Sequence, residues 1–193
     1  MTSYEAVVVG ASTGGLRALR TVASALPANF AAPVIAVLHI SPSSDGYYVS
    51  YFQDSCRVRV KEADEKEQAV SGWLYLAPPD YHLLIEDDGT FSLSTGERVS
   101  FARPSIDVLF ESAADAYCPG LIGVVLTGAN SDGSSGLKKI KKYGGLAVVQ
   151  DPGDAEEGFM PQAAISSTEV DYVLGLSEMG PLLKRLVGEK NGK

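Results

Sequence analysis

The sequence predicts an α/β protein with a mostly parallel, doubly wound sheet flanked by helices, and with an inserted antiparallel β-hairpin region. Buried-strand patterns alternate with helical patterns at both ends of the 193-residue chain, which is typical of βαβ units. Short alternating runs fill the middle, separated by turn formers such as Pro78-Pro79-Asp80, and these indicate hairpins. With no visible repeat or linker, we expect one domain over residues 1–188 and a tail over 189–193.

The first part of the chain alternates strand and helix. We expect strands over Ala6–Val9 and Val34–Leu38, a helix from about Gly15 to Leu26, and a second helix around Tyr48–Ser55. Alternating runs then predict four short strands, at Arg57–Val60, Trp73–Ala77, His82–Ile85 and Phe91–Ser94. Because turn residues separate these runs, we expect them to pair as antiparallel hairpins.

The last part of the chain returns to the strand–helix alternation. Ser105 is placed to cap a helix over Ile106–Ala116, since a serine hydroxyl can accept a hydrogen bond from the first turn. The remaining expected elements are a strand at Leu121–Leu126, a helix at Ser134–Tyr143, a strand at Leu146–Val149, a short helix near Pro161–Ile165, a strand at Tyr172–Leu174 and a helix at Glu178–Val187.

Composition and charge exclude several classes of protein. Hydrophobic residues make up 45% of the chain and charged residues 21%, the balance of a soluble globular protein. The net charge of -8 opposes non-specific binding to nucleic acid or anionic lipid. No apolar run reaches the roughly 18 residues of a membrane helix, and the N-terminus lacks a basic signal-peptide region. Cys56 and Cys118 have no metal-ligand spacing. We therefore expect a cytoplasmic protein without a metal site.

The stretch Gly10-Ala11-Ser12-Thr13-Gly14-Gly15 follows the first strand and opens a helix. A Gly-x-Ser-x-Gly turn of this kind is the pattern of a nucleophile elbow, which raises the serine hydroxyl above the edge of a sheet. The amides at the start of the helix point toward the same place, where an oxyanion can be stabilised. A phosphate-binding turn has a similar pattern, so the stretch alone leaves both readings open.

Two further residues occupy equivalent positions at the ends of later strands. His39 follows the strand at Val34–Leu38, and Asp132 follows the strand at Leu121–Leu126 after a short loop. The carboxyl ends of parallel strands share one edge of the sheet, so Ser12, His39 and Asp132 can meet there. A hydroxyl nucleophile needs a base, and the base needs an acceptor that fixes its tautomer.

Each candidate also has an alternative reading. A dinucleotide-binding oxidoreductase would place an acidic residue where His39 stands, which disfavours that function. Asp132 could simply cap the helix that begins near Ser134. His82 lies in the hairpin region and is interpreted as structural.

The chain resembles the catalytic domain of the chemotaxis protein-glutamate methylesterases, the CheB family. The resemblance spans about Val7 to Val187 and rests on blocks that occur in the same order. These blocks are Gly10–Gly15, Val37–Ile40, Gly72–Pro78 with Tyr81-His82-Leu83, Arg103–Asp107, Leu126-Thr127-Gly128 with Asp132-Gly133, and Gln150-Asp151-Pro152 with Met160–Ala164.

The resemblance implies a serine hydrolase with Ser12 as nucleophile, His39 as general base and Asp132 as its partner. It implies hydrolysis of glutamate methyl esters, and deamidation of certain glutamines, on the cytoplasmic helical region of chemoreceptors, without a cofactor. Thr13 and Ala129 would support the oxyanion through their backbone amides. Met160 is expected either to line the substrate groove or to have only a structural role in packing. Arg103 is expected to meet either a receptor carboxylate or a local acidic residue.

The sequence also departs from the family. Ala129-Asn130 stands where the family usually has Met-Gly, and Leu38 where a glutamine commonly precedes the histidine. These changes leave open a catalytically impaired receptor-binding module of the same fold. Because the first expected strand begins close to Met1, no receiver domain is expected in this chain, which is either a stand-alone esterase or part of a longer protein. The sequence does not identify the receptor or the oligomeric state.

Overall fold

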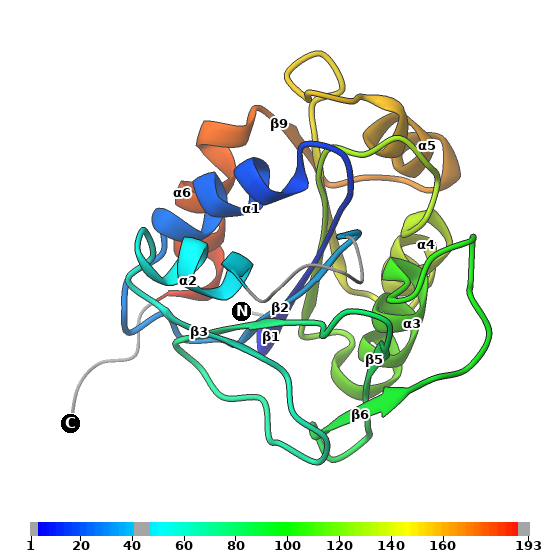
Figure 1. Ribbon diagram of the computed structural model, residues 1–193. Helices are drawn as coiled ribbons and strands as arrows, with labels where there is room; N and C mark the ends of the chain where they lie inside the picture. Colours follow the sequence, from blue (N-terminus) through cyan, green and yellow to red (C-terminus); the bar gives the residue numbers. More distant parts are fainter. Residues whose placement is uncertain (1–3, 41–46, 189–193) are drawn as a thin grey trace.

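The computed structural model describes residues 4–40 and 47–188. Within them, seven parallel strands form one sheet in the order β3-β4-β2-β1-β7-β8-β9, so the predicted α/β class with a doubly wound sheet is confirmed (Figure 1). The strands are β1 (Ala6–Ala11), β2 (Val34–Leu38), β3 (Arg59–Glu62), β4 (Trp73–Leu76), β7 (Leu121–Val125), β8 (Leu146–Gln150) and β9 (Tyr172–Leu174).

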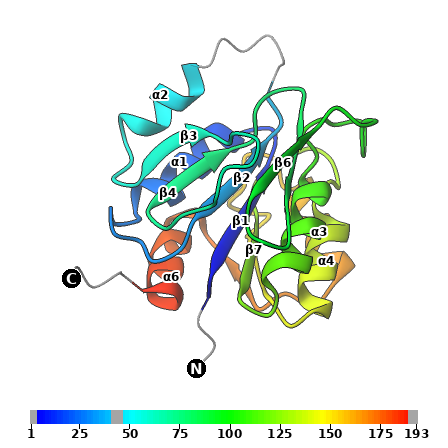
Figure 2. The same ribbon diagram turned by 90° about the horizontal axis from the view of Figure 1, so that it is seen from below.

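Helices cover both faces of the sheet (Figures 1 and 2). One face carries α1 (Gly15–Ser24), α2 (Tyr47–Gln53) and α6 (Leu176–Val187), and the other carries α3 (Ile106–Tyr117), α4 (Ser134–Lys142) and α5 (Phe159–Ser167). Alternate residues of β1 therefore enter two different cores, and every residue of this strand is buried. A strand that is buried on both faces has a continuous run of apolar residues, and such a run is what allowed β1 to be predicted from the sequence. In the described residues, no helix is both long enough and apolar enough to cross a membrane.

The middle of the chain differs in part from the prediction. The expected hairpin of β5 (His82–Ile85) with β6 (Phe91–Ser94) is present and antiparallel. However, β3 pairs in parallel with β4, and β4 in parallel with β2, so both strands belong to the main sheet. At the edge of the sheet, β3 is only partly buried. Its partial exposure gives the alternation that suggested an antiparallel hairpin.

The chain order places a crevice at the centre of the sheet. From β1 the chain moves to β2 on one side, whereas β7 and β8 lie on the other side. The point where strand order reverses is where doubly wound sheets leave a crevice beyond the carboxyl ends of their strands. Ser12, His39 and Asp132 all follow strands that border this point.

Candidate active site

Ser12 lies at the sharp turn between β1 and α1. The amide of Gly15 donates to the carbonyl of Ser12 at 2.7 Å, and Gly14 has a φ of 76°, in the left-handed region that glycine adopts without strain. The Ser12 amide donates to the carbonyl of Thr127, in the loop after β7, at 2.9 Å. The turn is thus fixed to the neighbouring strand end, and the serine side chain is held at the carboxyl edge of the sheet.

His39 and Asp132 form a hydrogen bond across the switch point. The distance from His39 Nε2 to Asp132 Oδ2 is 2.9 Å, with 13% of the histidine side chain exposed and none of the aspartate. An ionised carboxylate only accepts hydrogen bonds, so Nε2 carries the proton and Nδ1 presents a lone pair. A neutral imidazole in this state can accept a proton from a neighbouring hydroxyl.

The Asp132 carboxylate also binds the N-terminus of α3. It accepts hydrogen bonds from Ser105 Oγ at 2.9 Å and from the amides of Ile106 and Asp107 at 2.7 and 2.9 Å. Helix α4, which follows Asp132, has Gly133 as its N-cap and no side-chain cap. The alternative reading of Asp132 as the cap of its own helix is therefore wrong: it caps another helix and holds His39 with the same carboxylate.

These contacts keep the carboxylate ionised. Burial of Asp132 disfavours its charged form, but hydrogen bonds from His39 and from the Asp107 and Ile106 amides outweigh burial and hold its pKa below the ordinary value. The positive end of the α3 dipole acts in the same direction. A charged partner is what His39 requires when it takes up a proton.

Asn130 contacts the second nitrogen of the His39 ring. Its Nδ2 lies 3.3 Å from His39 Nδ1, while its Oδ1 accepts from the amide of Asp132 at 3.0 Å. The second contact closes an Asx turn, which fixes the orientation of the side-chain amide. No pattern in the sequence indicated that Asn130 would reach the histidine.

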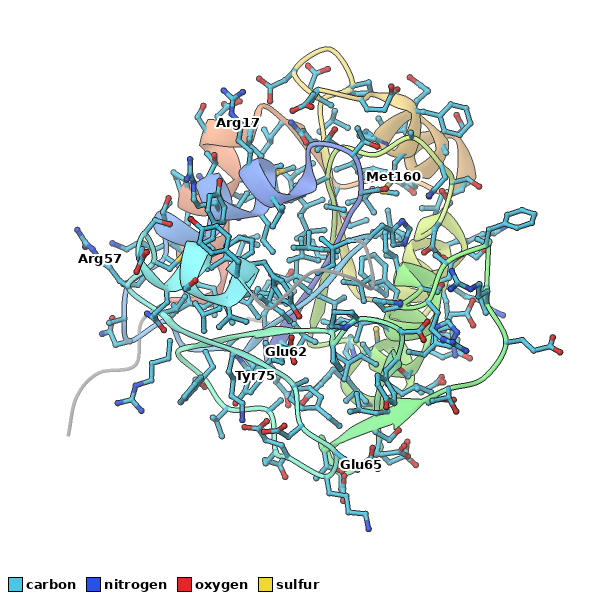
Figure 3. The ribbon with its side chains drawn as sticks, viewed as in Figure 1. Arg17, Arg57, Glu62, Glu65, Tyr75 and Met160 are labelled. Carbon is cyan, nitrogen blue, oxygen red and sulfur yellow. The ribbon has the colours of Figure 1, made fainter. Side chains whose placement is uncertain are left out.

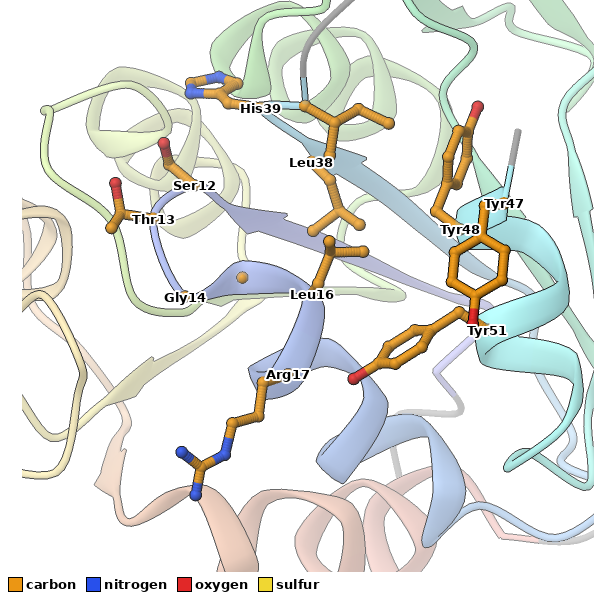
Figure 4. A pocket seen from close by; sticks show the side chains of 12 residues that line it. Ser12, Thr13, Gly14, Leu16, Arg17, Leu38, His39, Tyr47, Tyr48 and Tyr51 are labelled. Atoms are coloured by element: carbon orange, nitrogen blue, oxygen red, sulfur yellow. The ribbon is translucent and has the colours of Figure 1, made fainter. Parts of the chain in front are cut away.

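Two cavities meet at Ser12 and His39. One, of about 620 Å³, is bounded by the start of α1 and by Tyr47, Tyr48 and Tyr51 of α2. Figure 4 shows the Ser12 hydroxyl pointing toward the imidazole of His39 at its rim. The other, of about 290 Å³, lies between these residues, Asn130 and the loop over 98–104. A bound group can therefore reach both side chains from either direction.

The predicted oxyanion donors flank the serine. Within the described residues, no hydrogen bond occupies the amides of Thr13 and Ala129. Gly128 lies directly against Ser12, since a Cβ at this position would approach Ser12 Cβ to 3.0 Å and Met160 Sδ to 2.8 Å. The loop after β7 thus comes close to the serine because it has a glycine there, and Ala129 follows it immediately.

Met160 lines neither of these two cavities, whereas Arg103 lies in the wall of the smaller one and is held there by other residues of the chain. Met160, at the start of α5, is fully buried beneath Gly128, and its amide donates to the Gly128 carbonyl at 2.8 Å (Figure 3). Arg103 donates to Asp80 at 2.9 and 3.2 Å, and to the carbonyls of Thr95 and Gly96 at 2.9 Å. The structure therefore favours packing for Met160. Arg103 has a local acidic partner in Asp80, and its expected contact with a receptor carboxylate stays a prediction because the residue also lines the smaller cavity.

His82 is buried and has both ring nitrogens engaged in structural contacts. Its Nε2 bonds to the carbonyl of Glu97 at 2.8 Å, and its Nδ1 accepts from the amide of Ser105 at 3.1 Å. The predicted structural role fits this placement. In the described part of the chain, no cluster of three or more His, Cys, Asp or Glu side chains could hold a metal ion.

A doubly wound sheet with a serine at an elbow and a buried Asp–His pair at the switch point defines the architecture of a serine hydrolase. A family model described as CheB methylesterase matches residues 7–183. The chain belongs to the CheB methylesterase family.

Proteins similar to this chain match it over almost its whole length. A Leptospira interrogans protein, provisionally named a protein-glutamate methylesterase/protein-glutamine glutaminase, is 56% identical over 184 residues that cover 95% of each chain. A Thermotoga maritima protein-glutamate methylesterase/protein-glutamine glutaminase is 35% identical, with coverage of 96% of this chain and 55% of that protein. The crystal structure of the Thermotoga maritima CheB methylesterase catalytic domain superposes with a TM-score of 0.92, at 34% identity over 96% of this chain and 100% of that one.

Proposed function

We propose that this chain hydrolyses methyl esters on glutamate side chains of chemoreceptors, with Ser12 as nucleophile, His39 as general base and Asp132 as the partner of His39. The observation that carries the proposal is the Asp132–His39 hydrogen bond at a switch point where Ser12 shares the same cavities. Names of relatives with high coverage support the substrate class. Residues 1–188 form the catalytic domain in this proposal.

The first half of the reaction forms an acyl-enzyme. His39 Nδ1 takes the proton from Ser12 Oγ as the oxygen attacks the ester carbonyl carbon, and Asp132 stabilises the resulting imidazolium. The carbonyl oxygen becomes an oxyanion that the free amides of Thr13 and Ala129 can stabilise. When the intermediate collapses, the bond to methoxide breaks and His39 returns its proton, so methanol leaves. The Asn130 amide contacts Nδ1 in the resting geometry, so it must release this nitrogen before the proton leaves Ser12.

The second half regenerates the enzyme. Water loses a proton to His39 and attacks the acyl carbon, and Ser12 leaves with the proton from His39, which frees the glutamate carboxylate. A glutamine side chain can follow the same route with ammonia as the leaving group. Both reactions use the same nucleophile, so one substitution should stop both.

The decisive experiment replaces Ser12 with alanine and measures methanol released from a methylated chemoreceptor. Loss of a serine nucleophile costs on the order of 10⁶ in kcat in a serine hydrolase whose triad acts as a unit. Ser24→Ala, an exposed serine at the far end of α1, is the matched control and should keep full activity. A Ser12→Ala enzyme that retains more than about a hundredth of the parent rate would remove Ser12 from the mechanism.

A further inference from the structure

The loop over 95–104, between β6 and α3, forms one wall of the smaller cavity beside Ser12 and His39. Near its centre, Val99 and Ala102 exchange two backbone hydrogen bonds, of 3.1 and 2.9 Å, and so close a two-residue turn. The two central residues, Ser100 and Phe101, have φ values of 50° and 64°. Positive φ at both positions is the pattern of a type I′ turn, which favours Asn-Gly.

The residues at this tip are poorly suited to its backbone. An L-residue with a side chain is strained in the left-handed region, and bulky aromatic residues are especially rare there. The aromatic ring gains nothing from the fold, because Phe101 is 97% exposed. In the described part of the chain it is the most exposed of the large hydrophobic residues. Single exposed hydrophobic residues are common on protein surfaces, but this one is held out on a strained turn at the rim of the active-site cavity.

The base of the loop is firmly held. Arg103 bonds to the carbonyls of Thr95 and Gly96 and to the carboxylate of Asp80, so one guanidinium joins the two ends of the loop to the turn before β5. Arg98 adds a second ion pair with Asp80 at 3.6 Å. A rigid base that carries a fully exposed aromatic tip is the arrangement of a binding anchor, since little conformational entropy is lost when the ring is buried by a partner.

We propose that Phe101 is a docking anchor for the protein substrate, and that it inserts into an apolar depression on the helical surface that carries the esterified glutamate. The inference rests on the proposed function and adds a contact beyond the reacting side chain. The occupant is the substrate protein because Phe101 lines the same cavity as Ser12 and His39. A small ester that reacts at Ser12 offers no protein surface to bury the ring of Phe101, which is 97% exposed.

The test uses two substrates and three variants. The substrates are a methylated cytoplasmic fragment of a chemoreceptor and the small ester 4-nitrophenyl acetate. The main variant, Ser100→Asn/Phe101→Gly, removes the ring and installs the pair of residues that this turn prefers. Ser100→Asn alone keeps the ring. Tyr143→Ala removes an exposed aromatic at the end of α4, at the opposite edge of the sheet.

For the double variant we expect kcat/KM on the receptor fragment to fall at least about tenfold, mainly through KM. Hydrolysis of 4-nitrophenyl acetate should stay within about twofold of the parent, and the melting temperature should be unchanged or higher, because the turn is relaxed. The two single variants should match the parent on both substrates. The double variant has a more favourable turn than the parent. A lower kcat/KM on the receptor fragment alone therefore cannot result from a misfolded loop.

Two results would overturn the inference. One is receptor hydrolysis by the double variant within about threefold of the parent; the other is an equal loss on both substrates, which would indicate a disturbed active site. A parent enzyme that hydrolyses 4-nitrophenyl acetate but not the methylated fragment would instead overturn the proposed function, and this inference with it. The parent measurement thus separates the two failures.

Discussion

Asn130 connects the two parts of the candidate active site through one side chain. Its oxygen holds the backbone before α4, and its nitrogen contacts the His39 nitrogen that takes the proton from Ser12 in the proposed mechanism. The family resemblance leads one to expect a glycine at this position. The asparagine therefore adds a donor where the mechanism needs a free lone pair, and it also fixes the loop that carries Asp132.

Replacing Asn130 with glycine separates these two effects. The Asp132 amide loses its acceptor, so we expect the free energy of unfolding to fall by about 1 kcal/mol. Because Nδ1 is released at the same time, kcat/KM on a methylated receptor should stay within about tenfold of the parent. Chemical denaturation and methanol release measure the two quantities. A loss of activity beyond about 100-fold would mean that the Asn130 amide is needed to hold the histidine.

Asp132→Asn should damage both stability and activity. Each carboxylate oxygen accepts from a backbone amide of α3, so an NH₂ group in either position would face an N–H donor. An unsatisfied buried donor costs about 1–3 kcal/mol, and we expect the melting temperature to fall by about 5–10 °C. Activity should fall at least about 100-fold, because the equivalent Asp→Asn substitution in the triad of a serine protease costs about 10⁴ in kcat. If the variant keeps the activity of the parent, Asp132 takes no part in the reaction and the mechanism reduces to a Ser–His dyad.

At the scale of elements, α3 and α4 cap each other. Asp132, before α4, binds the N-terminus of α3, while Asp107 in the first turn of α3 accepts from the Gly136 amide of α4 at 2.7 Å. The two helices approach closely enough that a Cβ on Gly136 would come within 2.4 Å of Phe110 Cβ. The active-site carboxylate is thus positioned by a helix pair as well as by its own loop.

Helix α5 packs through Met160 against the loop that follows β7, and a substitution can test whether this contact supports the proposed reaction. Met160→Ala and Met179→Ala each empty a fully buried site, so both should lower the free energy of unfolding by about 2–4 kcal/mol. Met179 lies on α6, across the sheet. Because Met160 packs under Gly128, only its loss should lower kcat, by about tenfold or more, with KM unchanged. Equal kcat values in the two variants, well below their melting temperatures, would contradict a supporting role.

For the whole molecule, the parallel sheet and the sites at its edge could be predicted from the sequence. Strands such as β1 and β7 are buried on both faces and read as apolar runs. The residues that follow them share an edge by topology, so Ser12, His39 and Asp132 could be brought together without coordinates. Ser105 was predicted as the cap of α3 from its local sequence, and its hydroxyl does accept from the Val108 amide.

Other features depend on contacts that local sequence does not encode. The parallel pairing of β3 with β4 depends on how the chain between them crosses, and an edge strand has the same alternation as a hairpin strand. The binding of Asp132 to α3 joins residues 25 and 26 positions apart. Arg103 forms an ion pair with Asp80, which lies in a turn whose position depends on the whole hairpin region. A carboxylate shortly before a helix suggests a cap, but it does not tell which helix is capped.

The reciprocal caps also predict how the stability of the whole molecule varies with pH. Burial of the Asp107 carboxyl, with the nearby charge of Asp132, raises its pKa to about 6, although the Gly136 amide acts in the opposite direction. A carboxyl with a folded-state pKa above its unfolded value of 3.8 binds protons more tightly when folded. Its contribution to stability is therefore full below about pH 4 and is lost as the pH rises through about 6. Asp132, with a lowered pKa, has the opposite sign: its contribution is present above about pH 4 and is lost in more acidic solution.

Asp107→Asn should remove the part of this dependence that lies between pH 5 and 7. For the parent, we expect the free energy of unfolding to decrease from near pH 5 to near pH 7.5 by about 1.4 kcal/mol more than for the variant, because the folded pKa of about 6 lies one unit above the start of this range and one pKa unit corresponds to about 1.4 kcal/mol. Urea denaturation at the two pH values measures the difference, and all other titrating groups cancel in the comparison. Asp115→Asn, an exposed carboxylate on the same helix, is the matched control and should follow the parent. If the free energy of unfolding depends on pH in the same way for the parent and for Asp107→Asn over this range, the Asp107 carboxyl is already ionised at pH 5. In that case, burying a second carboxylate between α3 and α4 does not lower the stability of the protein.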